Sequence, residues 1–165
     1  MFLFQTYRSR TIWLTAAAAF LIAPGGVLAE AHHDDDHVLL RADDIAWGPG
    51  PDYIPDGAEV AVLYGDPGEE GVFAARFRFP EGYELAPHIH NQPEIVTVIS
   101  GTYNIGMGYE FDRDATEALE AGEFYAFPAG MAHFAYVEEE TVIQLNSPGP
   151  YLIEYPNPDD DPRNQ

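Results

Sequence analysis

The stretch GYELAPHIHNQPEIVTVISG, residues 82–101, places two histidines one residue apart and a glutamate four residues after the second. In an extended strand successive side chains point to opposite faces, so His88 and His90 share one face. Residues 91–93 form a short polar turn, and Glu94 opens the next β-rich run. We therefore expect the turn to bring the Glu94 carboxylate back beside two imidazoles.

The sequence around this stretch reads as short strands separated by turns rich in Gly, Pro and acidic residues. Residues 72–80, VFAARFRFP, alternate between apolar side chains and a face that carries Arg76 and Arg78. Further strands are expected at residues 59–65, 94–100, 102–108, 123–130, 132–137, 141–146 and 151–155. Only residues 114–122, DATEALEAG, are compatible with a helical turn. Many short strands with regular turns predict an antiparallel barrel or sandwich.

A third histidine lies within the expected domain. His133 follows His90 by 43 positions, just after a strand that Pro128 and Gly130 bring to an end. If the strands close into one barrel, His133 completes a cluster of three imidazoles and the Glu94 carboxylate. Such donors suit one divalent transition metal, for example Mn, Fe, Ni, Cu or Zn, with positions left open for water or substrate. The alternative is a surface pair, because an isolated H-x-H is common on exposed strands.

Residues 82–101 resemble the first signature of the cupin superfamily. The five positions that the family signature fixes are all matched at the family spacing, and they are Gly82, His88, His90, Glu94 and Gly101. The run GEFYAFPAGMAHFAYV, residues 122–137, is similar to the second signature. Its fixed positions are matched by Gly122, Pro128, Gly130 and His133, whereas Val137 stands where the family has a final asparagine.

This resemblance implies an all-β fold, the double-stranded β-helix or jelly-roll barrel of a single-domain cupin. It also implies that His88, His90, Glu94 and His133 are the metal ligands. Because the asparagine of the second signature is not a ligand, its replacement by Val137 bears on local packing and not on the metal. Single-domain cupins commonly pair through their sheets, so a homodimer is expected. The Tyr- and Pro-rich segments near residues 47–55 and 149–156 would suit such an interface, or would cover their own barrel.

The N-terminus has the layout of a secretory signal peptide. Residues 1–29 hold two arginines, a short apolar run and small residues before Glu30, and they contain no acidic residue. We predict a signal peptide at 1–29, a flexible His- and Asp-rich tail at 30–40, the barrel at 41–155 and a polar tail at 156–165. The mature protein is then periplasmic or secreted, with no membrane attachment after cleavage.

The chain carries 28 acidic residues against seven arginines, with no lysine and no cysteine, and its net charge is −21. Because nucleic acids and anionic lipid surfaces bind through cationic contacts, we expect neither as a partner. The lack of cysteine excludes disulfides, thiolate ligands and a cysteine nucleophile.

The expected cavity is apolar. Val96, Val98 and Ser100 share the parity of Glu94 along their strand, and no arginine falls inside either signature. Gln92, Tyr103, Gln144 and Asn146 are the candidates for polar contacts to a ligand. A dicarboxylate or phosphorylated substrate is disfavoured, because it would need cationic partners.

Three functions follow for such a site. The first is a metal-dependent oxygenase for a small organic substrate, in which Glu94 is a ligand or a catalytic base. The second is a non-catalytic cupin that binds or senses a small molecule. The third, a structural cupin with a vestigial site, is opposed by four intact ligands. We favour the enzyme, because open metal sites inside barrels usually carry chemistry.

Overall fold

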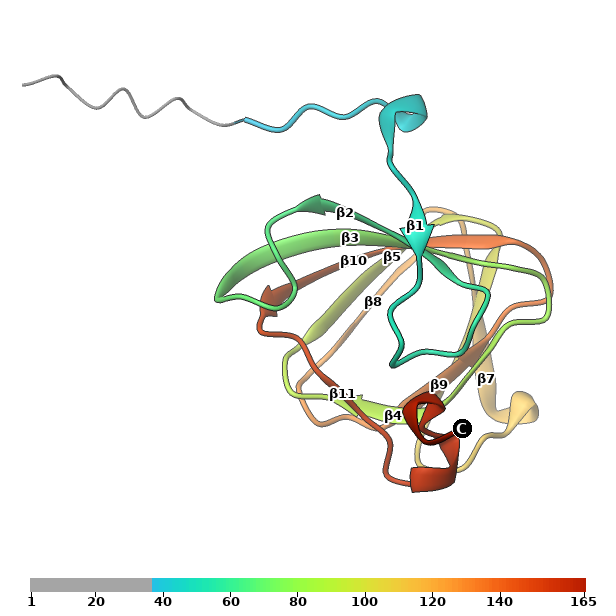
Figure 1. The fold of residues 1–165 in the computed structure, drawn as a ribbon. Coiled ribbons are helices and arrows are strands. Elements are labelled where there is room, and N and C mark those ends of the chain that lie inside the picture. The colour runs from blue at the N-terminus through green and yellow to red at the C-terminus, as the bar shows by residue number, and fades with distance from the viewer. Residues whose placement is uncertain (1–36) are drawn as a thin grey trace, which may run out of the picture. The chain divides into compact units, whose positions relative to one another are not determined.

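The computed structural model describes residues 37–165, so the predicted signal peptide and most of the predicted N-terminal tail lie outside the described residues. Two antiparallel sheets face each other and form a jelly-roll barrel (Figure 1). Within the described part of the chain every helix is a short 3-10 turn, and none is long and apolar enough to cross a membrane. The all-β jelly-roll prediction is confirmed.

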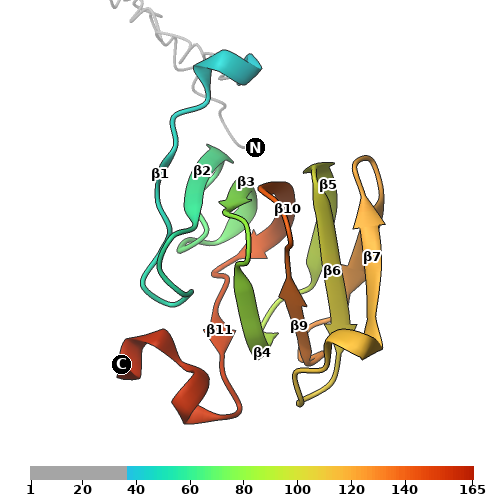
Figure 2. The same cartoon turned by 90° about the vertical axis from the view of Figure 1, so that its right-hand side faces the viewer.

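One sheet has six strands in the order β1-β2-β3-β10-β5-β8. Their bounds are β1 Gly48–Pro49, β2 Glu59–Tyr64, β3 Gly71–Phe79, β10 Thr141–Gly149, β5 Glu94–Ser100 and β8 Phe124–Phe127. The other sheet has five strands in the order β11-β4-β9-β6-β7, which lie side by side in Figure 2. Their bounds are β11 Ile153–Glu154, β4 Glu84–His90, β9 His133–Tyr136, β6 Thr102–Met107 and β7 Thr116–Glu120.

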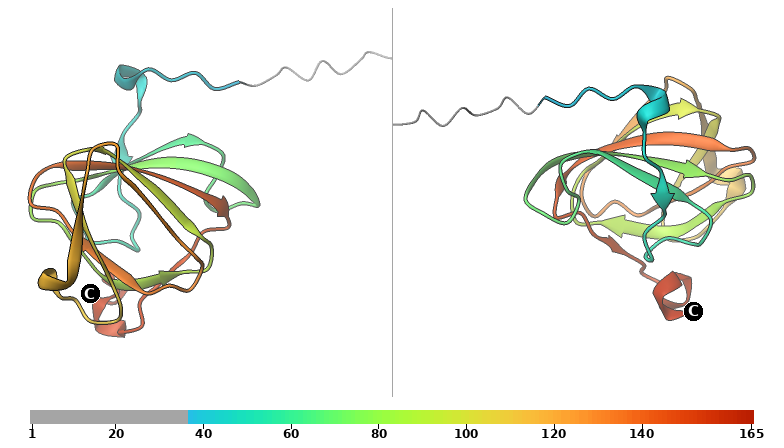
Figure 3. Two further views of the ribbon diagram at one scale, coloured as in Figure 1. Left: turned by 180° about the vertical axis from the view of Figure 1, so that it is seen from behind. Right: turned by 45° about the horizontal axis from the view of Figure 1, so that its top comes forward.

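The core lies between the two sheets, where alternation directs the apolar side chains. On β3, Phe73, Ala75 and Phe79 are buried, as their shared parity predicts. Phe79 stacks on Tyr83 with ring centroids 5.0 Å apart, and on Tyr103 at 6.0 Å. Each such aromatic pair adds about 0.5–1.5 kcal/mol beyond the burial of area. The views in Figure 3 show the two sheets curving around this interior.

Alternation fails near the end of β5. Val96 and Val98 are buried as expected, but Ser100 is exposed. The register between β10 and β5 shifts between Val142 and Ile143, and such a shift turns the following side chains to the other face. The inward orientation predicted for Ser100 is therefore wrong, and the reason is a local irregularity that the sequence pattern does not reveal.

The expected helical turn in residues 114–122 is smaller than predicted. A single 3-10 turn covers Arg113–Ala115, and the chain then enters β7. The C-terminal residues also contain 3-10 turns, at Pro158–Asp160 and Pro162–Asn164.

The segment between β1 and β2 crosses one end of the barrel, as Figure 1 shows. Two tyrosine hydroxyls from elsewhere in the chain hold it in place. Tyr83 donates a hydrogen bond to the carbonyl oxygen of Pro55, and Tyr155 donates one to the carbonyl oxygen of Tyr53 at 2.8 Å. The Pro- and Gly-rich segment therefore covers its own barrel in this structure.

Candidate metal centre

His88 and His90 face the barrel interior because β4 contains an irregularity just before them. The pairing of β4 with β9 shifts between Leu85 and His88, and Pro87 in this interval has no N–H to donate to the ladder. The shift lets both Leu85 and His88 point inward, although they are three residues apart. Normal alternation then brings His90 to the same side.

Glu94 and His133 reach the interior from two other strands. Glu94 is the first residue of β5, directly after the turn that follows His90. His133 begins β9 and lies opposite His88 in the strand register. The turn before it contains Gly130, whose φ of +77° favours glycine and whose N–H donates to the His90 carbonyl oxygen at 2.8 Å. The two signatures are thus joined by a backbone hydrogen bond beside the candidate ligands.

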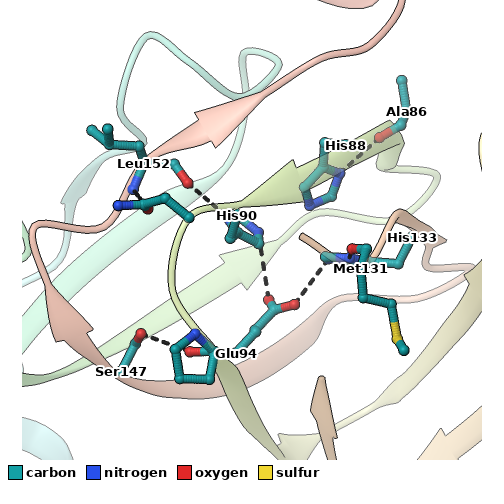
Figure 4. A network of polar contacts seen from close by, with 10 residues as sticks. Ala86, His88, His90, Glu94, Met131, His133, Ser147 and Leu152 are labelled. Atoms are coloured by element: carbon teal, nitrogen blue, oxygen red, sulfur yellow. Dashed lines mark hydrogen bonds and ion pairs between the residues drawn. The ribbon is translucent and has the colours of Figure 1, made fainter. Parts of the chain in front are cut away.

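The four predicted side chains meet in one buried group, which we call the His-Glu cluster and define as His88, His90, Glu94 and His133. Each residue is at most 8% exposed. One ligand nitrogen from each histidine lies within 4.8 Å of the other two. The Glu94 carboxylate closes the group, with Oε2 2.9 Å from His133 Nε2 and Oε1 3.9 Å from His90 Nε2 (Figure 4).

A backbone carbonyl orients each imidazole ring from behind. Nδ1 of His88 lies 2.8 Å from the Ala86 oxygen, Nδ1 of His90 lies 3.0 Å from the Leu152 oxygen, and Nδ1 of His133 lies 3.0 Å from the Met131 oxygen. A carbonyl oxygen only accepts, so Nδ1 carries the proton in each ring and the Nε2 lone pair of a neutral ring is free. This arrangement is typical of metal-binding histidines.

The charges within the His-Glu cluster follow from burial and from the proximity of its members. Burial, with smaller contributions from His133 and His90, lowers the pKa of His88 to about 3. Burial also lowers the pKa of His90. For Glu94, burial raises the pKa, but the neighbouring imidazoles, His133 foremost, outweigh this effect and lower it to about 2. The site therefore presents an ionised carboxylate beside neutral His88 and His90 at neutral pH.

His133 differs from the other two rings. Burial lowers its pKa, but the Glu94 carboxylate raises it by more, so the net direction is upward. Nε2 of His133 and Oε2 of Glu94 are in ion-pair range, yet their contact lacks hydrogen-bond geometry, and neither atom has a hydrogen-bond partner among residues 37–165. Two buried and unpartnered donor atoms facing each other are what a divalent cation would satisfy. The residues present thus fit a metal ion.

A cavity of about 50 Å³ adjoins the cluster. His88, His90 and Glu94 form its polar wall, and most of the remaining wall is apolar or aromatic. Of the four residues that we predicted for polar contacts, Tyr103 lines this cavity. Gln144 and Asn146 bond to each other instead, and Gln144 also accepts from Arg76, while Gln92 is not part of the wall.

Two tyrosines that line the cavity were missed by sequence reasoning. Tyr53 comes from the segment that crosses the barrel end, and Tyr151 comes from the turn between β10 and β11. The ring of Tyr151 stacks on the ring of His90, with centroids 4.4 Å apart and planes 23° from parallel. Neither segment has a strand periodicity that indicates a direction, so no sequence signal placed these residues.

Comparison with protein families supports the fold. Residues 48–146 match the family model described as Cupin. Germin-like protein 3-1 of rice, Oryza sativa subsp. japonica, is 29% identical over 164 residues, which cover 93% of this chain and 73% of that protein. Germin-like protein 1-1 of the same plant is 33% identical over 104 residues, or 58% of this chain. The chain spans about half the length of this second relative, at 48%.

Solved structures share the fold at low sequence identity. The polyketide cyclase RemF of Streptomyces resistomycificus has a TM-score of 0.59 and 17% identity, over 75% of this chain and 88% of that one. A candidate acetylacetone dioxygenase of Methylibium petroleiphilum has a TM-score of 0.58 and 20% identity, over 76% and 85%. Salicylate 1,2-dioxygenase of Pseudoaminobacter salicylatoxidans, solved with gentisate, has a TM-score of 0.52 and 17% identity, over 65% and 31%.

Proposed function

Because the chain belongs to the cupin family, we propose that it is an exported metal-binding cupin that acts as an oxygenase on a small organic molecule. One observation carries the proposal: one ring nitrogen from each of three buried histidines lies within 4.8 Å of the other two, and a carboxylate lies beside them. The His-Glu cluster would hold a single divalent transition ion through the Nε2 atoms and Glu94. Such an ion supplies Lewis acidity and, if it is redox-active, electron transfer with dioxygen.

The residues of this chain would perform the remaining tasks. The carbonyl oxygens of Ala86, Leu152 and Met131 would hold the three imidazole rings in one orientation, so the rings need not turn when a metal ion binds. Glu94 is an ionised carboxylate that can hold the ion through Oε1 or Oε2, whereas its pKa of about 2 makes it a weak base toward a substrate hydroxyl. The apolar walls exclude bulk water from the reacting group.

Two of the fold neighbours are named as dioxygenases, and at 20% and 17% identity they share the fold alone with this chain. One is named for acetylacetone and the other was solved with gentisate, and both compounds are small oxygen-bearing organic molecules. A comparable substrate for this chain agrees with the wall of the cavity, which contains no Lys or Arg to hold a phosphate or a dicarboxylate.

A ligand-binding cupin without turnover is the second candidate. The small volume of the cluster cavity, about 50 Å³, favours it, because this space has less room for a substrate together with dioxygen than for a single ligand head. Elemental analysis of protein purified without chelators or an affinity tag, followed by oxygen uptake with a panel of phenols and diketones, separates the two. We expect about one equivalent of metal and uptake with a member of the panel. Ligand retention without oxygen uptake would favour the binder, and protein without metal would refute both.

A further inference from the structure

A second cavity adjoins the one at the His-Glu cluster. It has a volume of about 170 Å³, and it shares Tyr53, Phe77, Leu145 and Tyr151 with the first as common walls. Its other walls are entirely apolar side chains of proline, valine, phenylalanine and alanine. The cavity at the His-Glu cluster therefore has a larger apolar cavity as its neighbour, with these four shared side chains between the two.

Tyr151 is one of the residues that line both cavities, and its hydroxyl has no hydrogen-bond partner among residues 37–165. The side chain is 9% exposed, and the hydroxyl oxygen itself is buried. A buried hydroxyl without a partner costs about 1–3 kcal/mol, so a ligand oxygen that accepts from Tyr151 would recover this free energy. The phenol is an O–H donor at neutral pH, and its ring is fixed by the stack on His90.

Size and charge restrict what this acceptor can belong to. One water molecule needs about 10–15 Å³ of cavity space. The cavity at the His-Glu cluster would therefore hold roughly three to five water molecules, and the apolar cavity roughly eleven to seventeen. Neither wall contains Lys or Arg. Beyond the proposed divalent ion, a ligand with two negative charges would therefore find no further counter-charge in these walls, and a ligand with many hydroxyls would leave them unpaired in the apolar part.

We propose that the interior takes a two-part molecule, with an oxygen-bearing head of at most one negative charge at the His-Glu cluster and an apolar body in the adjoining cavity. Tyr151 donates a hydrogen bond to the head and so selects for an oxygen acceptor. Phenols and enols with an alkyl or aryl substituent belong to this class. The assignment rests on the proposed metal site and adds the class of ligand and the residue that recognises it.

Hydroxamates test both parts, since chain length can vary while the metal-binding head stays the same. We would load the full mature protein with Co²⁺, measure its metal content, and titrate it with acetohydroxamate, hexanohydroxamate or oxalate while recording the visible absorption of the ion. We expect hexanohydroxamate to bind at least ten times more tightly than acetohydroxamate, because each buried methylene adds roughly a factor of four. Oxalate, with two charges and no apolar body, should bind most weakly.

The variant Tyr151→Phe keeps the stacked ring and removes only the hydroxyl. It should retain Co²⁺ and bind both hydroxamates about ten times more weakly, since it loses one hydrogen bond to a charged or polar head. Tyr125→Phe is the matched control, because the Tyr125 hydroxyl is also buried without a partner but does not line either cavity. This variant should bind the hydroxamates as the unaltered protein does.

The outcomes separate this inference from the proposed function. If the protein takes up no Co²⁺, the metal site itself fails. If Co²⁺ binds but the two hydroxamates bind equally, or oxalate binds as well as they do, the two-part ligand class is wrong. If Tyr151→Phe binds like the unaltered protein, Tyr151 is not the donor. Should Tyr151→Phe not fold, which circular dichroism would show, the chain-length and oxalate comparisons on the unaltered protein still decide the ligand class.

Discussion

At the scale of single residues, the candidate centre depends on side-chain atoms whose orientation the protein fixes before a metal ion or substrate binds. Each of the three Nδ1 atoms is hydrogen-bonded to a backbone carbonyl oxygen, so the Nε2 atom of each ring points into the interior. Glu94 supplies the negative charge that this interior otherwise lacks. Removing one member should therefore weaken metal binding far more than removing a histidine elsewhere.

Replacing His90 tests the cluster directly. In His90→Ala we expect metal affinity to fall more than about 100-fold, because a ligand is lost outright and outer-shell changes alone cost about 10–100-fold. Metal content after dialysis against a competing chelator is the measurement, and His37→Ala, a histidine outside the cluster, is the control. Full metal occupancy in a protein that lacks both His88 and His133 would contradict the assignment.

Asn91 acts on the cluster through the backbone. Its side-chain amide donates to the Pro150 oxygen at 2.9 Å, and its oxygen accepts from the Leu152 N–H at 2.7 Å. The Leu152 carbonyl in turn accepts from His90 Nδ1. Asn91 therefore fixes the segment that orients His90, as a positioning residue.

In Asn91→Ala we expect metal affinity to fall about tenfold, with a shift of the Co²⁺ absorption bands, because the His90 ring is held less firmly. Asn104→Ala is the matched control, since Asn104 also donates to a backbone carbonyl, that of Tyr136 at 3.3 Å, but lies on β6. Equal affinities and identical spectra for the two variants would show that Asn91 has no such role.

At the scale of elements, each of the two signatures has a glycine with positive φ in a turn that connects two strands. Gly101 joins β5 to β6 with a φ of +74°, and a Cβ there would lie 2.5 Å from Thr141 Oγ1 and 2.7 Å from the Glu140 oxygen. Gly122 joins β7 to β8 with a φ of +93°, and a Cβ there would meet no atom within 4 Å. Both positions need left-handed backbone, but only Gly101 also needs the space.

These two glycines form a matched pair for a stability measurement. Gly122→Ala should lower the free energy of unfolding by about 1–2 kcal/mol, the cost of placing an L-residue in the left-handed region. Gly101→Ala should lower the free energy of unfolding by about 1–3 kcal/mol more, because the added methyl also overlaps the Glu140 carbonyl oxygen and Thr141 at the start of β10. Urea denaturation followed by tyrosine fluorescence or circular dichroism compares them. A Gly101→Ala protein as stable as Gly122→Ala would show that the tight contact relaxes freely.

At the scale of the whole molecule, a strongly acidic surface surrounds an interior whose charge is concentrated in the His-Glu cluster. With a net charge of −21, we expect the chain to repel polyanions. The interior charges are shielded by two sheets and by the segment that crosses the barrel end. We propose that such a molecule works outside the cytoplasm, after removal of residues 1–29 or a slightly longer leader.

N-terminal sequencing of protein purified from its natural source tests export. We expect the mature chain to begin at Glu30 or His32, after a small residue, as signal peptidase cleavage requires. The same protein should be found in the medium or the periplasmic fraction. Recovery of a chain that still begins with Met1 would show that the leader is not processed in this way.

The sequence by itself determined the features that depend on neighbours along the chain. Alternation set His88 and His90 on one face, the short turn returned Glu94 beside them, and the spacing of both signatures indicated the jelly-roll. Tertiary structure alone decided which distant groups complete the site. Tyr53, Tyr151 and the Leu152 carbonyl come from segments without periodicity, and the irregularities at Pro87 and Ser100 change which face a side chain takes. Strand periodicity is a local property, whereas the closure of a barrel and the register of its sheets depend on contacts between residues far apart in the chain.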